Sequence, residues 1–237
     1  LFRPDTLLTR RDVDQLRRQV VPRTPYDLPE RGLLIPSLVT LAHTMQDNTL
    51  GEDKGLVAVN YDDAPNLIPQ AGARAEDVVA AGCAMSVLDH TDDDFIRYYH
   101  QLIQEFFAAR KLAREPKPDL VRAEWHVERV SPTLEDELKR IGDSDPLPPL
   151  PGTGWEETTV MAAAMSADPD AFVRELIDVN LPLAGRCAAA PDVNASDALC
   201  DDIRWALVER TQNPEADLRA RIAAGLALGE LGDPRYG

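Results

Sequence analysis

The sequence predicts a mainly α-helical protein, with a winged-helix-like unit that carries a small β-hairpin, followed by HEAT-like α-solenoid helices. Apolar residues recur at helical spacing, two short β-like runs flank a polar turn at residues 91–94, and helix start and stop signals repeat after residue 154. We expect three parts: a helical and winged-helix-like domain (1–115), a junction with a Pro-rich linker (116–154), and a HEAT-like helical domain (155–237).

The N-terminal part begins with two predicted helices. A short helix with a polar face is expected over residues 9–21, because Pro22 stops it. A second helix is expected over residues 29–46, where Pro36 either kinks or restarts it. Residues 47–73 have a loop composition, apart from the brief run GLVAVN, which is compatible with a short strand. Residues 75–83 then form one short helix.

A hairpin and a long helix complete this part. Residues 85–90 and 95–99 are β-like runs on either side of a polar turn, which is a hairpin signal. A helix starts at once from His100, and its apolar face is expected to contain Leu102, Phe106, Ala109 and Ala113. A helix, a hairpin and a second helix in this order suggest a winged-helix-like unit.

The junction contains an ordered element around Trp125, a helix over residues 133–141, and the run GDSDPLPPLPGTG, which has the composition of an extended spacer. We therefore expect a hinge near residues 146–154.

Helix signals recur beyond this spacer. Thr153 with Glu156 forms a capping box, and later helices are expected to start at Asp168-Pro169, Pro182, Ser196 and Asn213-Pro214. The last of these helices should face inward with Leu218, Ile222 and Leu226, and it should end at Gly232 and Pro234. Short helices that are each apolar on one stripe stack as α-solenoid pairs.

Charge and cysteine content restrict the function. The chain has 41 acidic and 25 basic residues, a net charge of −16, so nucleic acid and anionic lipid are not expected partners. Cys83, Cys187 and Cys200 show no metal-like or framework spacing, which favours reduced thiols in a cytoplasmic protein. No apolar run approaches the roughly 20 residues that span a bilayer. The first residue is Leu1 rather than methionine, which suggests an excised piece of a longer protein.

Catalytic and metal-binding motifs are absent from the sequence. GEDKG at residues 51–55 lacks the spacing and the Ser or Thr of a phosphate-binding loop, and neither a nucleophile elbow nor a zinc-binding His-Glu-x-x-His helix occurs. His90 with Asp92, Asp93 and Asp94 lacks the Gly and Glu of a calcium loop, which favours a solvated turn. We therefore predict no enzyme activity, no catalytic residue and no metal site within this chain.

One segment resembles a known family. YYHQLIQEFFAARKLA, residues 98–113, resembles the winged-helix signature of NACHT-type STAND NTPases, the class that includes the NLR inflammasome receptors. In that signature, aromatic-x-His-x-x-x-Gln-Glu-Phe/Tyr-x-Ala-Ala recurs, and the matching residues here are Tyr98, His100, Gln104, Glu105, Phe106, Ala108 and Ala109. Residues 33–46 and 76–88 resemble the helices that precede this element, and residues 154–165 and 221–237 resemble the helical region behind it in bacterial members.

The resemblance implies a role for His100. In that family the winged-helix histidine contacts the β-phosphate of bound ADP and holds the protein closed. An imidazole at a helix start can donate to a phosphate oxygen. The alternative is a structural histidine packed among Tyr98, Tyr99 and Phe106. Because the NTPase core is missing from this sequence, no cofactor is expected in the chain itself, and ATP or ADP would bind the parent protein.

The expected function is therefore a regulatory and scaffolding segment of a bacterial NACHT/STAND signalling NTPase, of the kind that acts in defence or conflict signalling. It would couple the nucleotide state of an NTPase core to a C-terminal sensor or effector, for which the resemblance implies a formylglycine-generating-enzyme-like or C-type-lectin-like domain. One alternative is a freestanding helical adaptor that binds a partner protein along its solenoid. A second, an unrecognised hydrolase, is disfavoured by the missing motifs.

Overall fold

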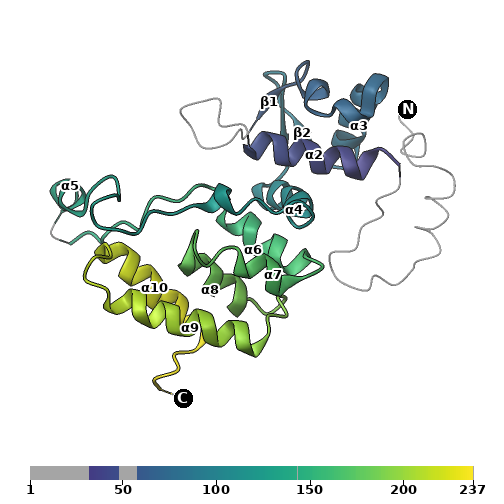
Figure 1. The fold of residues 1–237 in the computed structure, drawn as a ribbon. Helices are drawn as coiled ribbons and strands as arrows, with labels where there is room; N and C mark the ends of the chain where they lie inside the picture. Colours follow the sequence, from purple (N-terminus) through teal and green to yellow (C-terminus); the bar gives the residue numbers. More distant parts are fainter. Residues whose placement is uncertain (1–31, 48–57, 143, 237) are drawn as a thin grey trace. The chain divides into compact units, whose positions relative to one another are not determined.

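The computed structural model describes residues 32–47, 58–142 and 144–236 (Figure 1). The chain divides into two compact units, Leu1–Lys111 and Leu112–Gly237, called unit 1 and unit 2 below. Residues 116–154, expected as a junction and linker with a hinge near 146–154, lie within unit 2. The predicted helix over residues 9–21 lies outside the described residues. The described part of the chain is mainly helical with one small sheet, which confirms the predicted fold class.

Unit 1 alternates helices with short strands. Its elements are α2 (Leu34–Asp47), β1 (Val59–Asn60), the 3-10 helices η2 (Ala64–Leu67) and η3 (Pro69–Arg74), α3 (Ala75–Ala84), β2 (Leu88–His90), β3 (Phe95–Tyr98) and α4 (Gln101–Leu112). Pro36 lies in the first turn of α2, where a missing backbone N–H costs no helical hydrogen bond. The helix therefore starts only two residues before this proline.

The predicted hairpin is present and gains a third strand. β2 and β3 pair antiparallel, with Leu88 opposite Tyr98, and β1 pairs with the other edge of β3, with Val59 opposite Ile96. In β3, Ile96 and Tyr98 are buried while Phe95 and Arg97 are exposed, as expected for a sheet with one covered face. The run GLVAVN thus supplies a strand that supports a hairpin too small to be stable alone.

The sheet packs closely on α2 and α3. A Cβ atom added at Gly82 of α3 would lie 2.6 Å from Cδ1 of Leu88 and 3.3 Å from Cδ2 of Leu38. Both leucines are fully buried, so neither can move aside easily. The glycine is therefore the residue that lets α3 approach β2.

Unit 2 contains η4 (Pro118–Val121), α5 (Leu134–Arg140), α6 (Glu156–Met165), α7 (Pro169–Arg174), α8 (Leu181–Ala189), α9 (Asp197–Gln212) and α10 (Leu218–Leu231). From α6 onward each helix contacts the next, and α8 also contacts α6 and α10, so that the helices stack as in an α-solenoid (Figure 1). Ile203 and Leu207 of α9 are fully buried in this stack. Gly185 of α8 brings the backbone near α10, because an added Cβ would lie 3.1 Å from Cβ of Ala227.

Several helix starts agree with the sequence. The side chains of Asp168 and Ser196, both predicted helix starts, accept hydrogen bonds from backbone N–H groups in the first turns of α7 and α9. α8 begins at Leu181, one residue before the predicted Pro182, behind the capping residue Asn180. At α6 the Glu156 carboxylate accepts from the backbone N–H of Thr153 at 2.6 Å, which is half of the predicted capping box. Gly232, with φ 91°, ends α10 as predicted.

The predicted start of the last helix is wrong. Asn213 follows the end of α9, and α10 begins only at Leu218, behind the capping residue Asp217. The intervening residues turn at 214–215 and then pair with a distant segment: the backbone N–H of Asp217 donates to Trp125 O at 2.9 Å, and His126 and Ala216 form an isolated antiparallel bridge. A contact with a distant segment therefore overrides the local Asn-Pro start signal.

Two predicted apolar faces also need correction. Leu218, Ile222 and Leu226, expected to face inward, are 39%, 47% and 67% exposed, and Leu102 of α4 is 57% exposed. The buried residues of α10 are instead Arg219, three alanines (Ala220, Ala224 and Ala227) and two leucines (Leu228 and Leu231). Because α8 approaches α10 closely at Gly185, alanine fits that contact and leucine does not.

Candidate functional site

The junction between β3 and α4 is held by Tyr98. Its side chain is buried, its hydroxyl donates to the Leu38 carbonyl oxygen in α2 at 2.5 Å, and its ring centroid lies 6.0 Å from that of Phe107 in α4. Burial raises the pKa of Tyr98 well above its ordinary value, so the hydroxyl stays protonated and can act as the donor. One side chain thus connects α2, the sheet and α4, and it precedes His100 by two residues.

His100 occupies the turn that leads into α4. Its backbone oxygen accepts the N–H of Ile103 at 2.9 Å, and its side-chain Nδ1 accepts the N–H of Leu102 at 3.1 Å. The residue is exposed. Because Nδ1 accepts a hydrogen bond, the neutral ring carries its proton on Nε2, which leaves an N–H donor on the other side of the ring.

This arrangement can serve an anionic oxygen. The N–H groups of Leu102, Ile103 and Gln104 in the first turn of α4 already donate to His100, so the Nε2–H of His100 is the donor that this turn offers to a phosphate oxygen. Among the surrounding aromatic side chains, the rings of Tyr98 and Phe106 each contact the ring of Phe107. The ADP contact expected for His100 remains a prediction.

Other residues in and near the matched motif pack within unit 1 or make contacts along α4. Ala108 and Ala109 are fully buried, and Gln101 Nε2 donates to Glu105 Oε1 at 2.8 Å along one face of the helix. The Arg110 guanidinium lies 5.8 Å from the centroid of the Phe106 ring. The two alanines mark where α4 is most tightly enclosed.

The acidic turn between β2 and β3 is a solvent-exposed loop. His90 Nε2 lies 3.2 Å from Asp94 Oδ1, and its ring stacks on Tyr61 with a centroid separation of 4.6 Å. Asp92 and Asp93 are exposed. Within residues 32–47, 58–142 and 144–236, no group of three or more His, Cys, Asp or Glu side chains is placed to hold a metal ion.

The three cysteines are poorly suited to nucleophilic chemistry. Burial raises the pKa of Cys187 to about 12. Burial, and then the nearby charge of Asp89, raise the pKa of Cys83, while burial is also the main cause that raises the pKa of Cys200. Since the thiolate is the reactive form, each of these thiols is held in its less reactive state near neutral pH.

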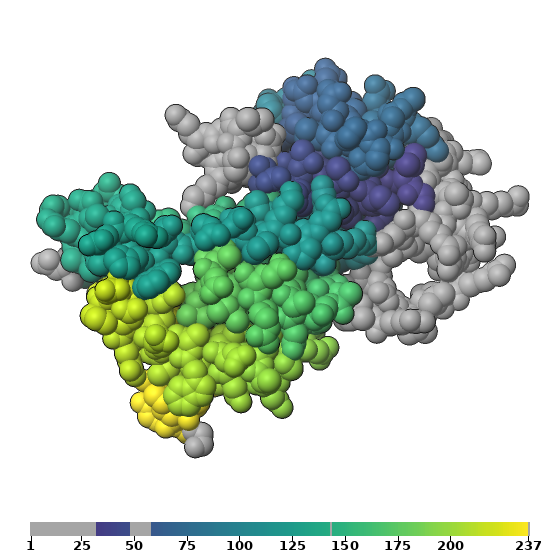
Figure 2. All heavy atoms as spheres, in the orientation of Figure 1, coloured from purple at the N-terminus to yellow at the C-terminus, as the bar shows by residue number. Residues whose placement is uncertain are grey.

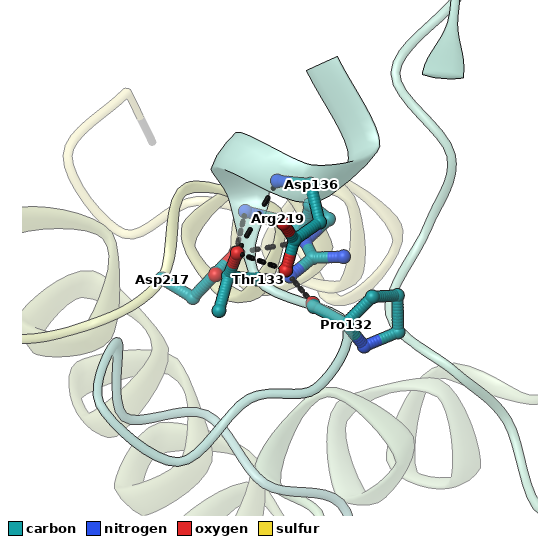
Figure 3. Close-up of polar contacts among 5 residues, drawn as sticks. All are labelled: Pro132, Thr133, Asp136, Asp217 and Arg219. Carbon is teal, nitrogen blue, oxygen red and sulfur yellow. Dashed lines mark hydrogen bonds and ion pairs between the residues drawn. The ribbon is translucent and has the colours of Figure 1, made fainter. Parts of the chain in front are cut away.

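A buried ion pair lies at the start of α10, and the sequence analysis did not identify it (Figure 3). Asp217 and Arg219 are 1% and 3% exposed, and the Arg219 Nε donates to Asp217 Oδ1 at 3.0 Å. Arg219 Nη2 donates to Asp217 Oδ2 at 3.1 Å and to the Pro132 carbonyl oxygen at 2.7 Å. Next to this carbonyl, Thr133 caps α5 by accepting the N–H of Asp136. The pair therefore connects α10 to the loop before α5.

The pair makes the stability of the protein sensitive to acid. Burial alone would raise the pKa of Asp217, but hydrogen bonds from Arg219 and the charges of Arg219 and Arg221 lower it below its ordinary value. A lowered pKa in the folded state stabilises the fold above the pKa of an unfolded aspartate, about 3.9, and this contribution is lost as the pH falls through the folded pKa.

We expect Asp217→Asn to destabilise the protein more at pH 7 than at pH 3, because the stability that the wild-type carboxylate contributes declines once the pH is below the pKa of an unfolded aspartate. Urea unfolding at both pH values measures the difference. Asp136→Asn is the control, since the pKa of Asp136 is also lowered, chiefly by the Thr133 hydroxyl, but its side chain is exposed. An equal loss of stability at both pH values for Asp217→Asn would contradict the expectation.

Unit 2 also contains a groove of about 480 Å³ that the sequence analysis did not identify. It is lined by residues 123–125, 149–152 and 177–183, by Arg186 and Arg210, and by one side of α10. The Arg210 guanidinium lies 3.8 Å from the centroid of the Trp125 ring, and Arg186 Nη2 donates to Glu157 Oε1 at 2.6 Å. The sequence of α10 could have indicated a binding surface, because a helix that is apolar on two faces can pack one face inside the protein and leave the other for a partner.

Two further findings bear on function. None of the helices in the described part of the chain has both the length and the apolar character needed to cross a membrane. Comparisons with protein-family models, with curated proteins and with solved structures return no match.

Proposed function

We propose that this chain is a regulatory and scaffolding segment of a NACHT/STAND-type signalling NTPase, which couples the nucleotide state of an NTPase core to a sensor or effector domain. The observation that carries the proposal is the exposed imidazole of His100 at the start of α4, with Nδ1 bound to the Leu102 N–H and Nε2–H left as a donor. In the intact protein this donor binds the β-phosphate of ADP and holds the closed state.

The surroundings of His100 support this role. Tyr98 fixes the β3–α4 junction through its hydrogen bond to Leu38 O, so the imidazole starts from a rigid element. In the proposal, ATP or ADP belongs to the core on the N-terminal side. The stacked helices of unit 2 lead to a C-terminal partner domain, formylglycine-generating-enzyme-like or C-type-lectin-like. The setting is cytoplasmic bacterial defence or conflict signalling.

The test is His100→Ala in the intact protein. Loss of one hydrogen bond to a charged phosphate costs about 1–3 kcal/mol, so ADP should dissociate roughly 5- to 150-fold faster. The protein should also oligomerise or signal without its trigger. Stopped-flow release of a fluorescent ADP analogue measures the rate, and a thermal melt measures stability in parallel.

Tyr99→Ala is the matched control, because Tyr99 is the exposed neighbour of His100 and is not part of the matched motif. It should leave the ADP release rate unchanged. A lowered melting temperature with an unchanged release rate for His100→Ala would reduce His100 to a structural residue and remove the basis of the proposal.

A freestanding helical adaptor is the second candidate, and the groove of unit 2 is the observation that favours it. The two candidates differ in what surrounds the chain in its gene. A phosphate-binding loop encoded upstream in the same reading frame supports the NTPase segment, whereas a native start near Leu1 supports the adaptor.

A further inference from the structure

We infer that the groove of unit 2 binds an amphipathic helix of a partner protein, one that carries leucine-like side chains on one face and lysine or arginine beside them. This inference concerns a surface remote in sequence from His100 and does not depend on nucleotide binding. The apolar lining of the groove and the charges at its rim determine which side chains the partner should carry.

Apolar side chains from several segments line the groove, among them Trp125, Leu150 and Leu226. Leu226 lines the groove, and Ile222 and Leu218 precede it at intervals of four residues on the same face of the helix. All three side chains are exposed. Leu150 and Ala223 add to the lining, and Figure 2 shows the teal part of unit 2 lying against its green and yellow part.

A groove of this kind suits a helix. Its volume of about 480 Å³ falls within the range of roughly 300–1,000 Å³ typical of binding pockets. Helices bind to proteins by laying apolar side chains, spaced three or four residues apart, into such a groove. The lining runs along α10 from Ala220 to Glu230 and along residues 177–183, and this length favours an elongated partner over a compact small molecule.

The charges at the rim select a basic partner. Both arginines of the lining are occupied, Arg186 by Glu157 and Arg210 by the Trp125 ring. Among the acidic residues, Glu156 already accepts the backbone N–H groups of Thr153 and Gly154.

Three carboxylates remain at the rim: Glu124, Asp178 and Glu230. They are exposed. No ion pair joins Glu124 or Asp178 to a basic side chain of the described residues, whereas, against the effect of burial, the charge of Glu230 adds to that of Glu157 in raising the pKa of Arg186. A protein with a net charge of −16 adds a long-range field of the same sign. Lysine or arginine beside the apolar face of the partner therefore complements this rim, and an acidic partner is repelled.

Two 16-residue helical peptides test the inference on the full chain. Both carry leucine on one face; the remaining positions are lysine in one peptide and glutamate in the other. We expect the lysine peptide to bind and to shift the NMR signals of α10 and residues 123–125, and the glutamate peptide to bind at least about tenfold more weakly. A higher salt concentration should weaken the binding of the lysine peptide.

Variants with matched controls assign the binding to the groove. We expect the affinity for the lysine peptide to fall about tenfold in the triple variant Glu124→Gln/Asp178→Asn/Glu230→Gln, because each exposed charge pair contributes roughly 0.5 kcal/mol. Neutralisation of three exposed carboxylates of unit 1, Glu76, Asp92 and Asp93, should have a much smaller effect. Leu226→Ser should also weaken binding about tenfold, whereas Trp205→Ser, at an apolar side chain of α9 that is 59% exposed and outside the groove lining, should not.

Three results would overturn the inference: equal binding of both peptides, equal effects of the groove variants and their controls, or signal shifts confined to unit 1. Sedimentation of the chain without peptide tests whether a second copy of the chain occupies the groove. Self-association that Leu226→Ser abolishes would assign the surface to a second copy of this chain instead of a basic helix.

Discussion

Replacement of Arg219 by methionine is expected to lower the free energy of unfolding by about 3–5 kcal/mol. Methionine has a side chain of similar length to arginine but no charge. The substitution therefore leaves the Asp217 carboxylate buried without the guanidinium of Arg219. It also removes the hydrogen bond from Arg219 to the Pro132 carbonyl oxygen. Urea unfolding measures the loss, and hydrogen exchange of the first turns of α5 and α10 should show where protection falls.

Two controls separate the buried charge from the contact itself. In Asp217→Asn/Arg219→Met the buried charge is gone, so the double variant should be more stable than Arg219→Met alone. Lys139→Met removes the exposed pair between Lys139 and Glu135, whose atoms are also close at 2.7 Å, and should cost less than about 1 kcal/mol. If Arg219→Met costs no more than Lys139→Met, the pair does not join α10 to the loop before α5.

Features set by neighbouring residues could be predicted from the sequence. Asp168 and Ser196 cap helices because an oxygen-bearing side chain reaches N–H groups two or three residues ahead, a contact that needs no knowledge of the rest of the fold. The hairpin of β2 and β3 is equally local, since its turn and both strands lie within residues 88–98. The helix that starts after His100 could also be predicted, because the residues that form the start of α4 are neighbours in the sequence.

Features set by distant contacts could not be predicted. The chain turns at residues 214–215 and does not start a helix there, because Ala216 and Asp217 pair with residues near Trp125, about 90 positions earlier in the sequence. The small side chain of Ala227 on the inward face of α10 fits because Gly185 on another helix approaches it closely. The Asp217–Arg219 pair is close in sequence, but its burial depends on the carbonyl of Pro132. In each case the deciding partner lies far along the chain.

Replacement of Tyr98 by alanine is the second large effect, and we expect it to destabilise unit 1 by about 3–5 kcal/mol. The substitution leaves a cavity between the sheet and Phe107 and removes the hydrogen bond to the Leu38 carbonyl oxygen. Tyr98→Phe separates these two contributions, because it keeps the ring and loses only the hydroxyl, at a cost of about 1 kcal/mol. Hydrogen exchange of α2 and α4 amides, measured with urea unfolding, reports on unit 1 specifically.

Tyr99→Ala tests whether the effect comes from the buried ring. Tyr99 is 67% exposed, so its removal should change the free energy of unfolding by no more than about 0.5 kcal/mol. Similar losses for the two alanine variants would mean that Tyr98 does not hold the β3–α4 junction. If Tyr98 does hold it, the intact protein carrying Tyr98→Ala should also release ADP faster, because His100 would lose its fixed position while keeping its imidazole. A normal release rate from a Tyr98→Ala protein with a loosened α4 would instead separate the stability of this junction from the proposed role of His100.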